Sequence, residues 1–266
     1  MTSEPPDGRR IAAFFDLDKT VLATSSTLAF ARPFRAEGLI DARSAIKSAY
    51  AQAMFRLGGA DEKQMQRMRD HLTGLVAGWE VAQIRQIVDE TLHEIVPPLV
   101  FAEAADLIAD HRRRGHDVVI VSASGAEVVA PIARLLGADH AAATTMRIED
   151  GRYTAEIENY CFGPGKVVEM ERLAATHGYD LAGSYAYSDS STDLPMLEAV
   201  GLPTAVNPDR ALRKAAEERD WPILEFTDPL LPRRPERTVS LAAALALGVG
   251  VATGIGAGAA YRVRRR

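Results

Sequence analysis

Asp16 and Asp18 are two carboxylates that could act together, because they stand two positions apart after a short apolar run, Ile11 to Phe15. The run predicts a buried strand, and residues two apart on an extended segment point to the same side. In an α/β sheet, the carboxyl end of a strand opens onto the binding crevice. Two carboxylates so close repel each other unless one is protonated or a cation lies between them. We therefore expect Mg²⁺ there, since this ion prefers oxygen ligands.

Polar residues follow three later segments in a way that could complete such a site. Ser122 follows a second apolar run, Lys166 follows a glycine-containing turn, and Asp189 and Asp193 follow a third apolar run. Taken singly, a serine, a lysine and an acidic pair in these positions have ordinary explanations as turn, surface and helix-capping residues. Their order along the chain makes the combination informative.

Taken together, these residues resemble the four motifs of the haloacid dehalogenase phosphatases. Asp16-Leu17-Asp18-Lys19-Thr20 is similar to the family's Asp-x-Asp-x-Thr motif, and a Ser, a Lys and an acidic pair follow in the family's order. The resemblance covers about residues 11–210 and is closest to the branch that includes the phosphoserine phosphatases. It implies a Mg²⁺-dependent phosphoric monoester hydrolase that acts on a small phosphorylated substrate. It also implies a Rossmann-like parallel sheet with helices on both faces and an inserted all-helical cap.

The resemblance assigns the catalytic roles to three residues. Asp16 would attack phosphorus and become an aspartyl phosphate. Asp18 would protonate the leaving alcohol and then take a proton from water. Lys166 would neutralise charge on the transferring phosphoryl group.

The remaining motif residues would bind the phosphate and the metal ion. Thr20, Ser122 and Thr192 would form hydrogen bonds to the substrate. The metal ligands would be Asp16, Asp189 and the main-chain carbonyl of Asp18, and Asp193 would hold Lys166 or a metal-bound water. A phosphotransferase or phosphomutase would use the same aspartyl phosphate, and a regulatory protein could keep the fold and act by binding.

Two positions depart from the phosphoserine phosphatase pattern. Ser25 stands where those enzymes have the glutamate that meets the substrate amine, and Thr192 stands where they usually have asparagine. A hydroxyl cannot pair with an ammonium as a carboxylate does, so both departures weaken phosphoserine as the substrate. Glu37 or Asp41 could replace the missing glutamate.

Strands alternate with helices over most of the chain, which favours a parallel sheet in an α/β layer fold. Apolar residues at helical spacing between the first and second strands predict the separate cap. The expected divisions are a disordered N-terminus at 1–10, the α/β core at 11–24 and 97–228, the cap at 25–96, a linker at 229–237, a transmembrane helix at 238–261 and a basic tail at 262–266.

The segment from Thr238 to Tyr261 has 24 residues without a charge, flanked by arginines. A helix of that length is about 36 Å long, enough to span a bilayer. Gly250, Gly254 and Gly258 have the spacing that allows two such helices to approach closely, so a homodimer is possible. We expect a cytoplasmic catalytic domain anchored to the membrane by this helix.

The composition of the chain limits its possible partners and covalent cross-links. The net charge of −5 gives no reason to expect nucleic acid as a partner. A single cysteine, Cys161, excludes an intramolecular disulfide and is expected to be a packing residue. The polar N-terminus lacks the apolar region of a signal peptide. The cluster from His111 to His116 is expected to cap a helix C-terminus, where cations are favoured.

Overall fold

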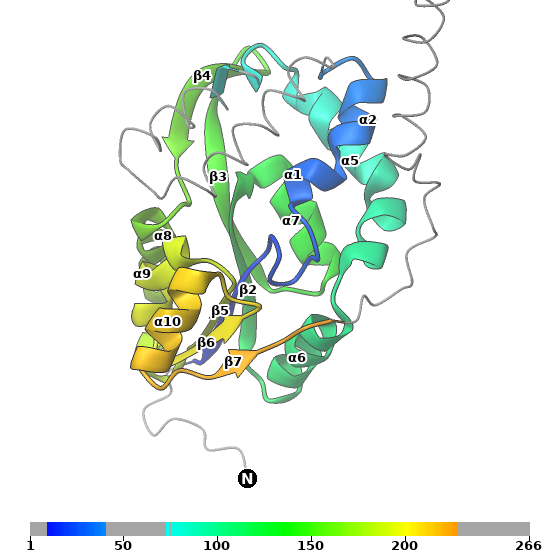
Figure 1. Ribbon diagram of the computed structural model, residues 1–266. Helices are drawn as coiled ribbons and strands as arrows, with labels where there is room; N and C mark the ends of the chain where they lie inside the picture. The colour runs from blue at the N-terminus through cyan, green and yellow to red at the C-terminus, as the bar shows by residue number, and fades with distance from the viewer. Residues whose placement is uncertain (1–9, 41–72, 75, 228–266) are drawn as a thin grey trace, which may run out of the picture. The chain divides into compact units, whose positions relative to one another are not determined.

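The apolar run after Arg10 forms the central strand of the sheet, β1 (Ala12–Asp16), and all five of its residues are buried. The computed structural model describes residues 10–40, 73–74 and 76–227 (Figure 1). Among these residues the sheet has the strand order β4-β3-β2-β1-β5-β6-β7. The other strands are β2 (Asp117–Gly125), β3 (His140–Glu149), β4 (Arg152–Asn159), β5 (Tyr185–Ser188), β6 (Leu202–Val206) and β7 (Ile223–Leu224).

All neighbouring strands pair in parallel except β3 and β4, which form an antiparallel hairpin. In the sequence, an alternating pattern over residues 145–158, broken by Glu149-Asp150-Gly151-Arg152, predicts this hairpin. The hairpin is present, but β3 begins at His140, before the alternating pattern starts. Its first half pairs with β2 and its second half with β4. The run His-Ala-Ala-Ala is too weakly apolar to have predicted a core strand.

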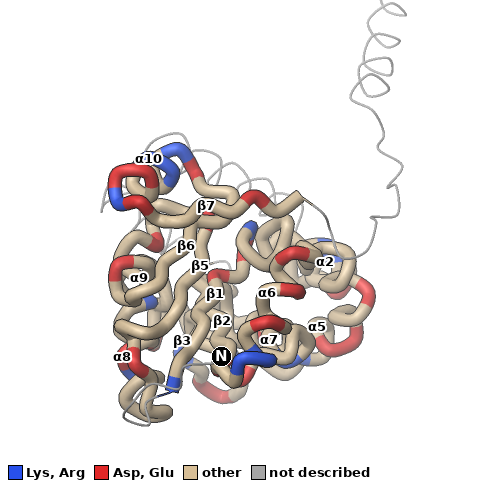
Figure 2. Tube along the Cα trace, turned by 90° about the horizontal axis from the view of Figure 1, so that it is seen from below, with Lys and Arg blue, Asp and Glu red and all other residues tan. Residues whose placement is uncertain are grey.

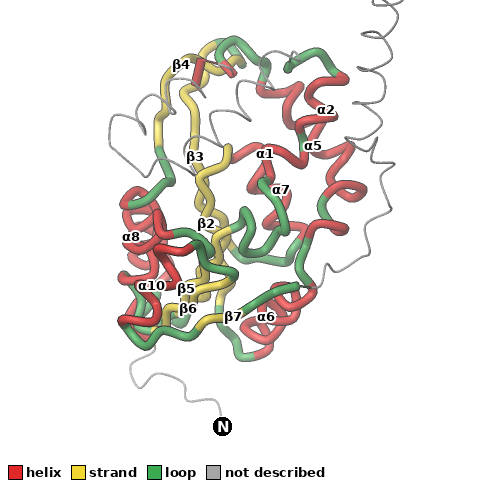
Figure 3. Tube along the Cα trace, in the orientation of Figure 1, coloured by secondary structure: helices red, strands yellow, loops and turns green. Residues whose placement is uncertain are grey.

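Helices cover both faces of the sheet, as expected, and Figures 1 and 3 show the strands between two groups of them. The α-helices are α1 (Ser26–Ala29), α2 (Ala31–Ala36), α5 (Val81–Ile95), α6 (Ala102–Arg113), α7 (Ala126–Leu135), α8 (Pro164–His177), α9 (Leu194–Glu198) and α10 (Arg210–Glu218). Short 3₁₀ turns lie at Pro97–Leu99, Leu181–Gly183 and Ser191–Asp193.

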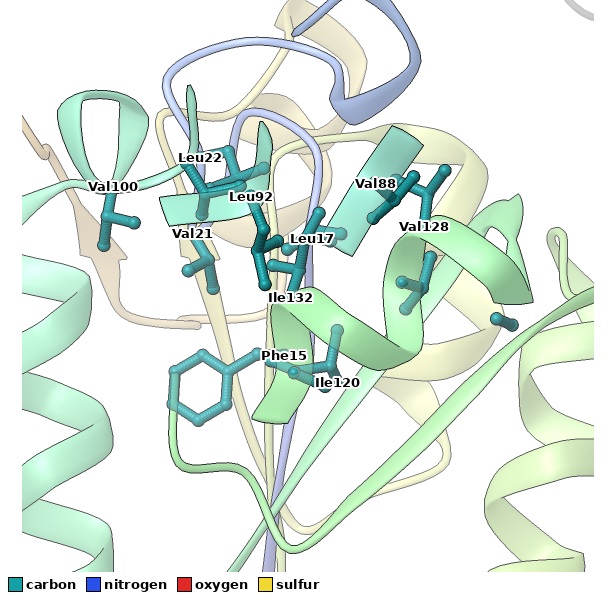
Figure 4. Packing of buried hydrophobic residues seen from close by; sticks show 14 of the residues in the cluster. Phe15, Leu17, Val21, Leu22, Val88, Leu92, Val100, Ile120, Val128 and Ile132 are labelled. Carbon is teal, nitrogen blue, oxygen red and sulfur yellow. The ribbon is translucent and has the colours of Figure 1, made fainter. Parts of the chain in front are cut away.

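The alternation of side chains along β1 divides the core in two. Phe15 belongs to a cluster with residues of α5, α6 and α7, whereas Phe14 belongs to a cluster with residues of α8, α9 and α10. Figure 4 shows part of the first cluster, in which Phe15 and Ile120 lie near Ile132 of α7. Helix α10 buries an apolar face, and both acidic and basic residues lie along it (Figure 2). Both clusters leave the carboxyl ends of the central strands free to carry polar residues.

The described part of the expected cap, between residues 25 and 96, contains the helices α1, α2 and α5, and Glu80 forms an isolated β-bridge with Arg152 of β4. Residues 41–72 and 75 of this segment lie outside the described residues. Helix α5 shares a hydrophobic cluster with α7, to which it contributes Ile84, Val88 and Leu92. The last helix of the expected cap is thus packed against a core helix.

The expected membrane helix at 238–261, with Gly250, Gly254 and Gly258, lies outside the described residues. Within residues 10–40, 73–74 and 76–227, no helix has the length and apolar character needed to cross a bilayer.

The expectation that the cluster from His111 to His116 provides a charged helix cap is wrong for His111. This side chain is buried on the same face of α6 as Ala104 and Ile108. Its Nε2 atom lies 2.9 Å from the Tyr187 hydroxyl, and its Nδ1 atom lies 2.9 Å from Nδ1 of His116. Burial lowers the pKa of His111 to about 4, so the ring is neutral near pH 7.

Candidate active site

Three strands bring the polar motif residues to one edge of the sheet. Strand β1 ends at Asp16, and it pairs in parallel with both β2 and β5. Ser122 lies opposite this end on β2, one position after the partner of Asp16. Asp189 follows directly after β5. Because parallel strands end at the same edge, residues distant in sequence become neighbours there.

Lys166 connects two of the predicted carboxylates. Its Nζ atom donates hydrogen bonds to Asp16 Oδ1 at 2.6 Å and to Asp193 Oδ2 at 2.7 Å. All three side chains are buried. Lysine is almost never fully buried unless it is paired, so this arrangement depends on the two carboxylates.

A tight turn delivers Lys166 to this position at the start of α8. Gly163 has a φ angle of 52°, which glycine adopts readily and most side chains do not. A Cβ atom at Gly165 would lie 2.0 Å from the carbonyl oxygen of Tyr160, so only glycine fits there. The glycines before the lysine therefore have a structural reason.

Burial and nearby charges together shift the pKa values of the groups in the site. Burial raises the pKa of Asp16 well above its usual value, Lys166 lowers it, and neighbouring carboxylates, above all Asp193, raise it again. Burial lowers the pKa of the Lys166 ammonium, but Asp16 and Asp193 together raise it by more. The ammonium therefore stays charged. A further cation beside Asp16 would favour its ionised form.

Asp189 and Asp16 both lie within hydrogen-bonding reach of the Thr20 hydroxyl. The Thr20 hydroxyl is 3.2 Å from Asp16 Oδ2 and 3.5 Å from Asp189 Oδ1. Burial raises the pKa of Asp189 to about 6, although Lys19 Nζ lies 3.8 Å from its Oδ2 atom and lowers it. Oxygen atoms crowded in this way suit a hard divalent cation such as Mg²⁺.

The described residues contain no group of three His, Cys, Asp or Glu side chains placed to hold a metal ion. The predicted ligand set supplies only two such side chains, Asp16 and Asp189, because Asp18 would contribute its main-chain carbonyl. The residues present fit the ion, and its binding remains a prediction.

The side chain of Asp18 is held by serines on two other segments. Its Oδ1 atom accepts a hydrogen bond from the main-chain N–H of Ser26 at 2.8 Å, and its Oδ2 atom accepts one from the Ser124 hydroxyl at 3.2 Å. The two carboxylates of the first motif thus have different partners, since Asp16 is bonded to Lys166 and Thr20.

Ser122 and Thr192 each have a hydrogen-bonding partner two residues away in the chain. The Ser122 hydroxyl is buried and accepts a hydrogen bond from the main-chain N–H of Ser124 at 3.2 Å. Thr192 Oγ1 lies 3.0 Å from the hydroxyl of Ser190. Their predicted contacts with phosphate remain predictions.

Sequence reasoning missed several short side chains that support the site. Ser188 donates a hydrogen bond to Asp193 Oδ2 at 2.6 Å, and both residues are buried. Asp209 accepts hydrogen bonds from the main-chain N–H and the hydroxyl of Ser191, and its own N–H donates to the carbonyl of Asp189 at 2.8 Å. Apart from Asp209 in its turn sequence Asn-Pro-Asp, which is typical of a helix cap, nothing in the sequence marks them.

A mostly parallel sheet with helices on both faces, whose carboxyl edge carries a buried aspartate–lysine–aspartate chain, is the arrangement of an α/β hydrolase. The chain belongs to the haloacid dehalogenase-like hydrolase family, whose model matches residues 13–198. Its fold is the expected α/β arrangement, and it lies close to the phosphoserine phosphatases within that family.

Similar proteins support this placement. A probable phosphatase of Mycobacterium tuberculosis is 63% identical over 221 residues, which are 83% of this chain and 77% of that protein. A phosphoserine phosphatase of the same species is 34% identical over 225 residues, 84% of this chain and 73% of that protein. A crystal structure of a Bordetella pertussis protein of unknown function has a TM-score of 0.70 and 32% identity, and the match covers 81% of this chain and 98% of that one.

Proposed function

We propose that this chain is a Mg²⁺-dependent phosphatase that hydrolyses a small phosphomonoester through an aspartyl phosphate on Asp16. The observation that carries the proposal is the buried contact of Lys166 with both Asp16 and Asp193 at the carboxyl edge of the sheet. Family membership and the relatives named as phosphatases support the assignment to the phosphoric monoester hydrolases.

In the first step, a carboxylate oxygen of Asp16 forms a bond to phosphorus while the bond to the leaving oxygen breaks. The leaving oxygen keeps that electron pair and takes a proton from Asp18. In the second step, a water oxygen bonds to phosphorus, the phosphorus–Asp16 bond breaks, and the water proton passes to Asp18. Free phosphate leaves, and both carboxyl groups return to their starting states.

Lys166 balances the charge that moves through these steps. Its ammonium already touches Asp16, so it lies beside the phosphoryl group once that group is attached. Thr20 and Ser122 are the hydroxyls at the same edge that would hold the phosphoryl oxygens. A bound Mg²⁺, held by Asp16, Asp189 and the main-chain carbonyl of Asp18, would supply further positive charge to these oxygens.

The substrate proposal rests on Ser25 and Thr192. Ser25 precedes α1 and makes no hydrogen bond from its side chain to cap that helix. A hydroxyl at this position suits an uncharged polar leaving group better than an ammonium. A phosphotransferase or phosphomutase would differ only in the acceptor, with a second hydroxyl in place of water.

The remaining parts of the chain complete the proposal. Residues 25–96 would form the cap over the site, with the core at 11–24 and 97–228. The uncharged segment at 238–261 would anchor the catalytic domain to the cytoplasmic side of a membrane. Gly250, Gly254 and Gly258 could pair two anchors.

The test is phosphate release by the full chain in detergent micelles with Mg²⁺. The panel contains an aryl phosphate, phosphoserine, sugar phosphates, phosphocholine and a soluble lysophospholipid phosphate. We expect release that requires Mg²⁺ and that the Asp16→Asn variant loses. Asp220→Asn is the matched control, because Asp220 is an exposed residue with a φ angle of 54°, a conformation that asparagine tolerates. Release that persists in Asp16→Asn would contradict the proposed nucleophile.

A further inference from the structure

The carboxylate of Asp18 is held at both oxygens, and the two groups that hold it come from segments far apart in the sequence. Ser26 is the first residue of α1, and Ser124 lies near the end of β2. The Ser26 hydroxyl donates to the Ser124 hydroxyl at 2.9 Å, and the Ser124 hydroxyl donates to Asp18 Oδ2 at 3.2 Å. The main-chain N–H of Ser26 donates to Asp18 Oδ1 at 2.8 Å. We call Ser26 and Ser124 the serine relay.

The serine relay is itself fixed in place. Ser26 is fully buried, and its hydroxyl has Ser124 as its acceptor. The main-chain N–H of Ser124 donates to the buried hydroxyl of Ser122 at 3.2 Å, which ties the relay to the end of β2. Because one hydroxyl hydrogen can serve one acceptor, the donor directions run from Ser26 to Ser124 to Asp18.

The contacts leave Asp18 able to carry a proton. Each carboxylate oxygen has about two lone-pair sites, and each accepts one hydrogen bond from the serine relay. Among residues 10–40, 73–74 and 76–227, these are the hydrogen bonds that the carboxylate accepts, which leaves one site on each oxygen without a partner from this part of the chain. The relay fixes the orientation of the carboxyl group without occupying the site that exchanges protons.

We propose that Ser124, supported by Ser26, is a positioning residue that aims the carboxyl group of Asp18 at the leaving oxygen. This inference rests on the proposed function, because it concerns the proton that Asp18 gives up as the phosphorus–oxygen bond breaks. In this role Ser124 acts through Asp18, to which its hydroxyl donates a hydrogen bond, rather than on the phosphoryl group. Its role can therefore be separated from phosphate binding.

Substrates with different leaving groups distinguish a role in positioning Asp18 from a role in phosphate binding. An aryl oxygen with a low pKa leaves without a proton, whereas an alkyl oxygen needs one from the acid. The parameter kcat/KM reports steps up to the first irreversible one, here the formation of the aspartyl phosphate. A misoriented Asp18 carboxyl group should therefore lower kcat/KM for an alkyl phosphate far more than for p-nitrophenyl phosphate.

The experiment compares both substrates in the full-length wild type and in Ser124→Ala with Mg²⁺ present. We expect kcat/KM for the alkyl phosphate to fall about tenfold more than for the aryl phosphate, a part of the roughly hundredfold contribution of a general acid. Ser124→Thr keeps the hydroxyl and should restore most of the loss. Ser26→Ala removes the donor to Ser124. It should also lower kcat/KM more for the alkyl than for the aryl phosphate, but by a smaller factor than Ser124→Ala.

Ser184→Ala is the matched control. Ser184 is a buried serine whose hydroxyl accepts from the N–H of Ala12 and donates to the carbonyl of Asp180, so its loss should affect stability and both substrates equally. An equal loss for the two substrates in Ser124→Ala, as expected of a phosphate-binding group, overturns the assignment and leaves the proposed function standing. No turnover of either substrate by the wild type overturns the proposed function and this inference with it.

Discussion

Lys166 donates a hydrogen bond of 2.6 Å to Asp16 although 150 positions separate the two residues. Asp16 ends the central strand, and Lys166 lies in the first turn of α8. The contact is buried, so neither charge is solvated by bulk water. The pair therefore links the stability of the site to its chemistry.

Replacement of Lys166 by alanine should destabilise the protein strongly. Asp16 and Asp193 would remain buried without their shared counter-charge, which costs about 3–5 kcal/mol of unfolding free energy when one partner of a buried pair is removed. Urea denaturation at pH 7 measures this change, and addition of Mg²⁺ should recover part of it. Lys214→Ala, which breaks an exposed pair with Glu218, should change stability by less than about 0.5 kcal/mol. Equal effects of the two substitutions would contradict the role of the buried charge.

Asp209 should support metal binding by holding the loop after β5. Its side chain caps α10 through the N–H of Leu212 and also binds Ser191, and its N–H binds the carbonyl of Asp189. Asp209→Ser keeps an oxygen that can cap the helix but has none left for Ser191. We expect Mg²⁺ affinity, measured by calorimetry without substrate, to fall about tenfold.

Asn207→Gly is the control for this loop. Asn207 lies two positions before Asp209, and its side chain binds the main chain of Phe226 rather than the Asp189 loop. Glycine also suits its φ angle of 44°. Similar Mg²⁺ affinities in Asp209→Ser and Asn207→Gly would show that the contact of Asp209 with Ser191 does not contribute to Mg²⁺ binding.

His111 should make stability depend on pH. Burial lowers its pKa in the folded protein to about 4, below the usual value of 6.5. The unfolded chain therefore binds the proton more readily, and stability is lost as pH falls from 6.5 towards 4. The full loss is about 3 kcal/mol, from about 1.4 kcal/mol for each pH unit.

The measurement is the difference in unfolding free energy between pH 7 and pH 4.5. His111→Gln retains a polar group that can bond the Tyr187 hydroxyl but does not titrate, so its difference should be smaller than that of the wild type. His93→Gln alters an exposed histidine and should behave as the wild type. Identical pH profiles for all three proteins would contradict the assignment to His111.

Deletion of residues 238–266 should release the protein from membranes. The segment Thr238 to Tyr261 carries no charge over 24 residues, and a span would hold the full chain in the membrane fraction through an alkaline carbonate wash. The shortened chain should appear in the supernatant and keep its turnover of soluble phosphomonoesters. A full chain that is itself extracted by carbonate would rule out the anchor.

The sequence by itself predicted the α/β class, the buried strands at the motifs and the family. Short apolar runs followed by carboxylates have few other structural solutions, and four motifs in a fixed order are specific in combination. The hairpin of β3 and β4 was also predicted, because the sequence Glu-Asp-Gly-Arg between the two strands strongly favours a tight turn.

Only the tertiary structure decided the contacts that join distant segments. The serine relay on Asp18, the hydrogen bond of Ser188 to Asp193 and the tie of Asp209 to Asp189 all involve short polar side chains. Such residues have many acceptable partners, and their spacing along the chain carries no periodic signal. His111 shows the converse, because it lies in the last turn of α6, where a positive charge is favoured, but on the buried face of the helix, where its ring is neutral. Packing of that face against Tyr187 outweighed the local preference, and this choice depends on which strand lies beneath the helix.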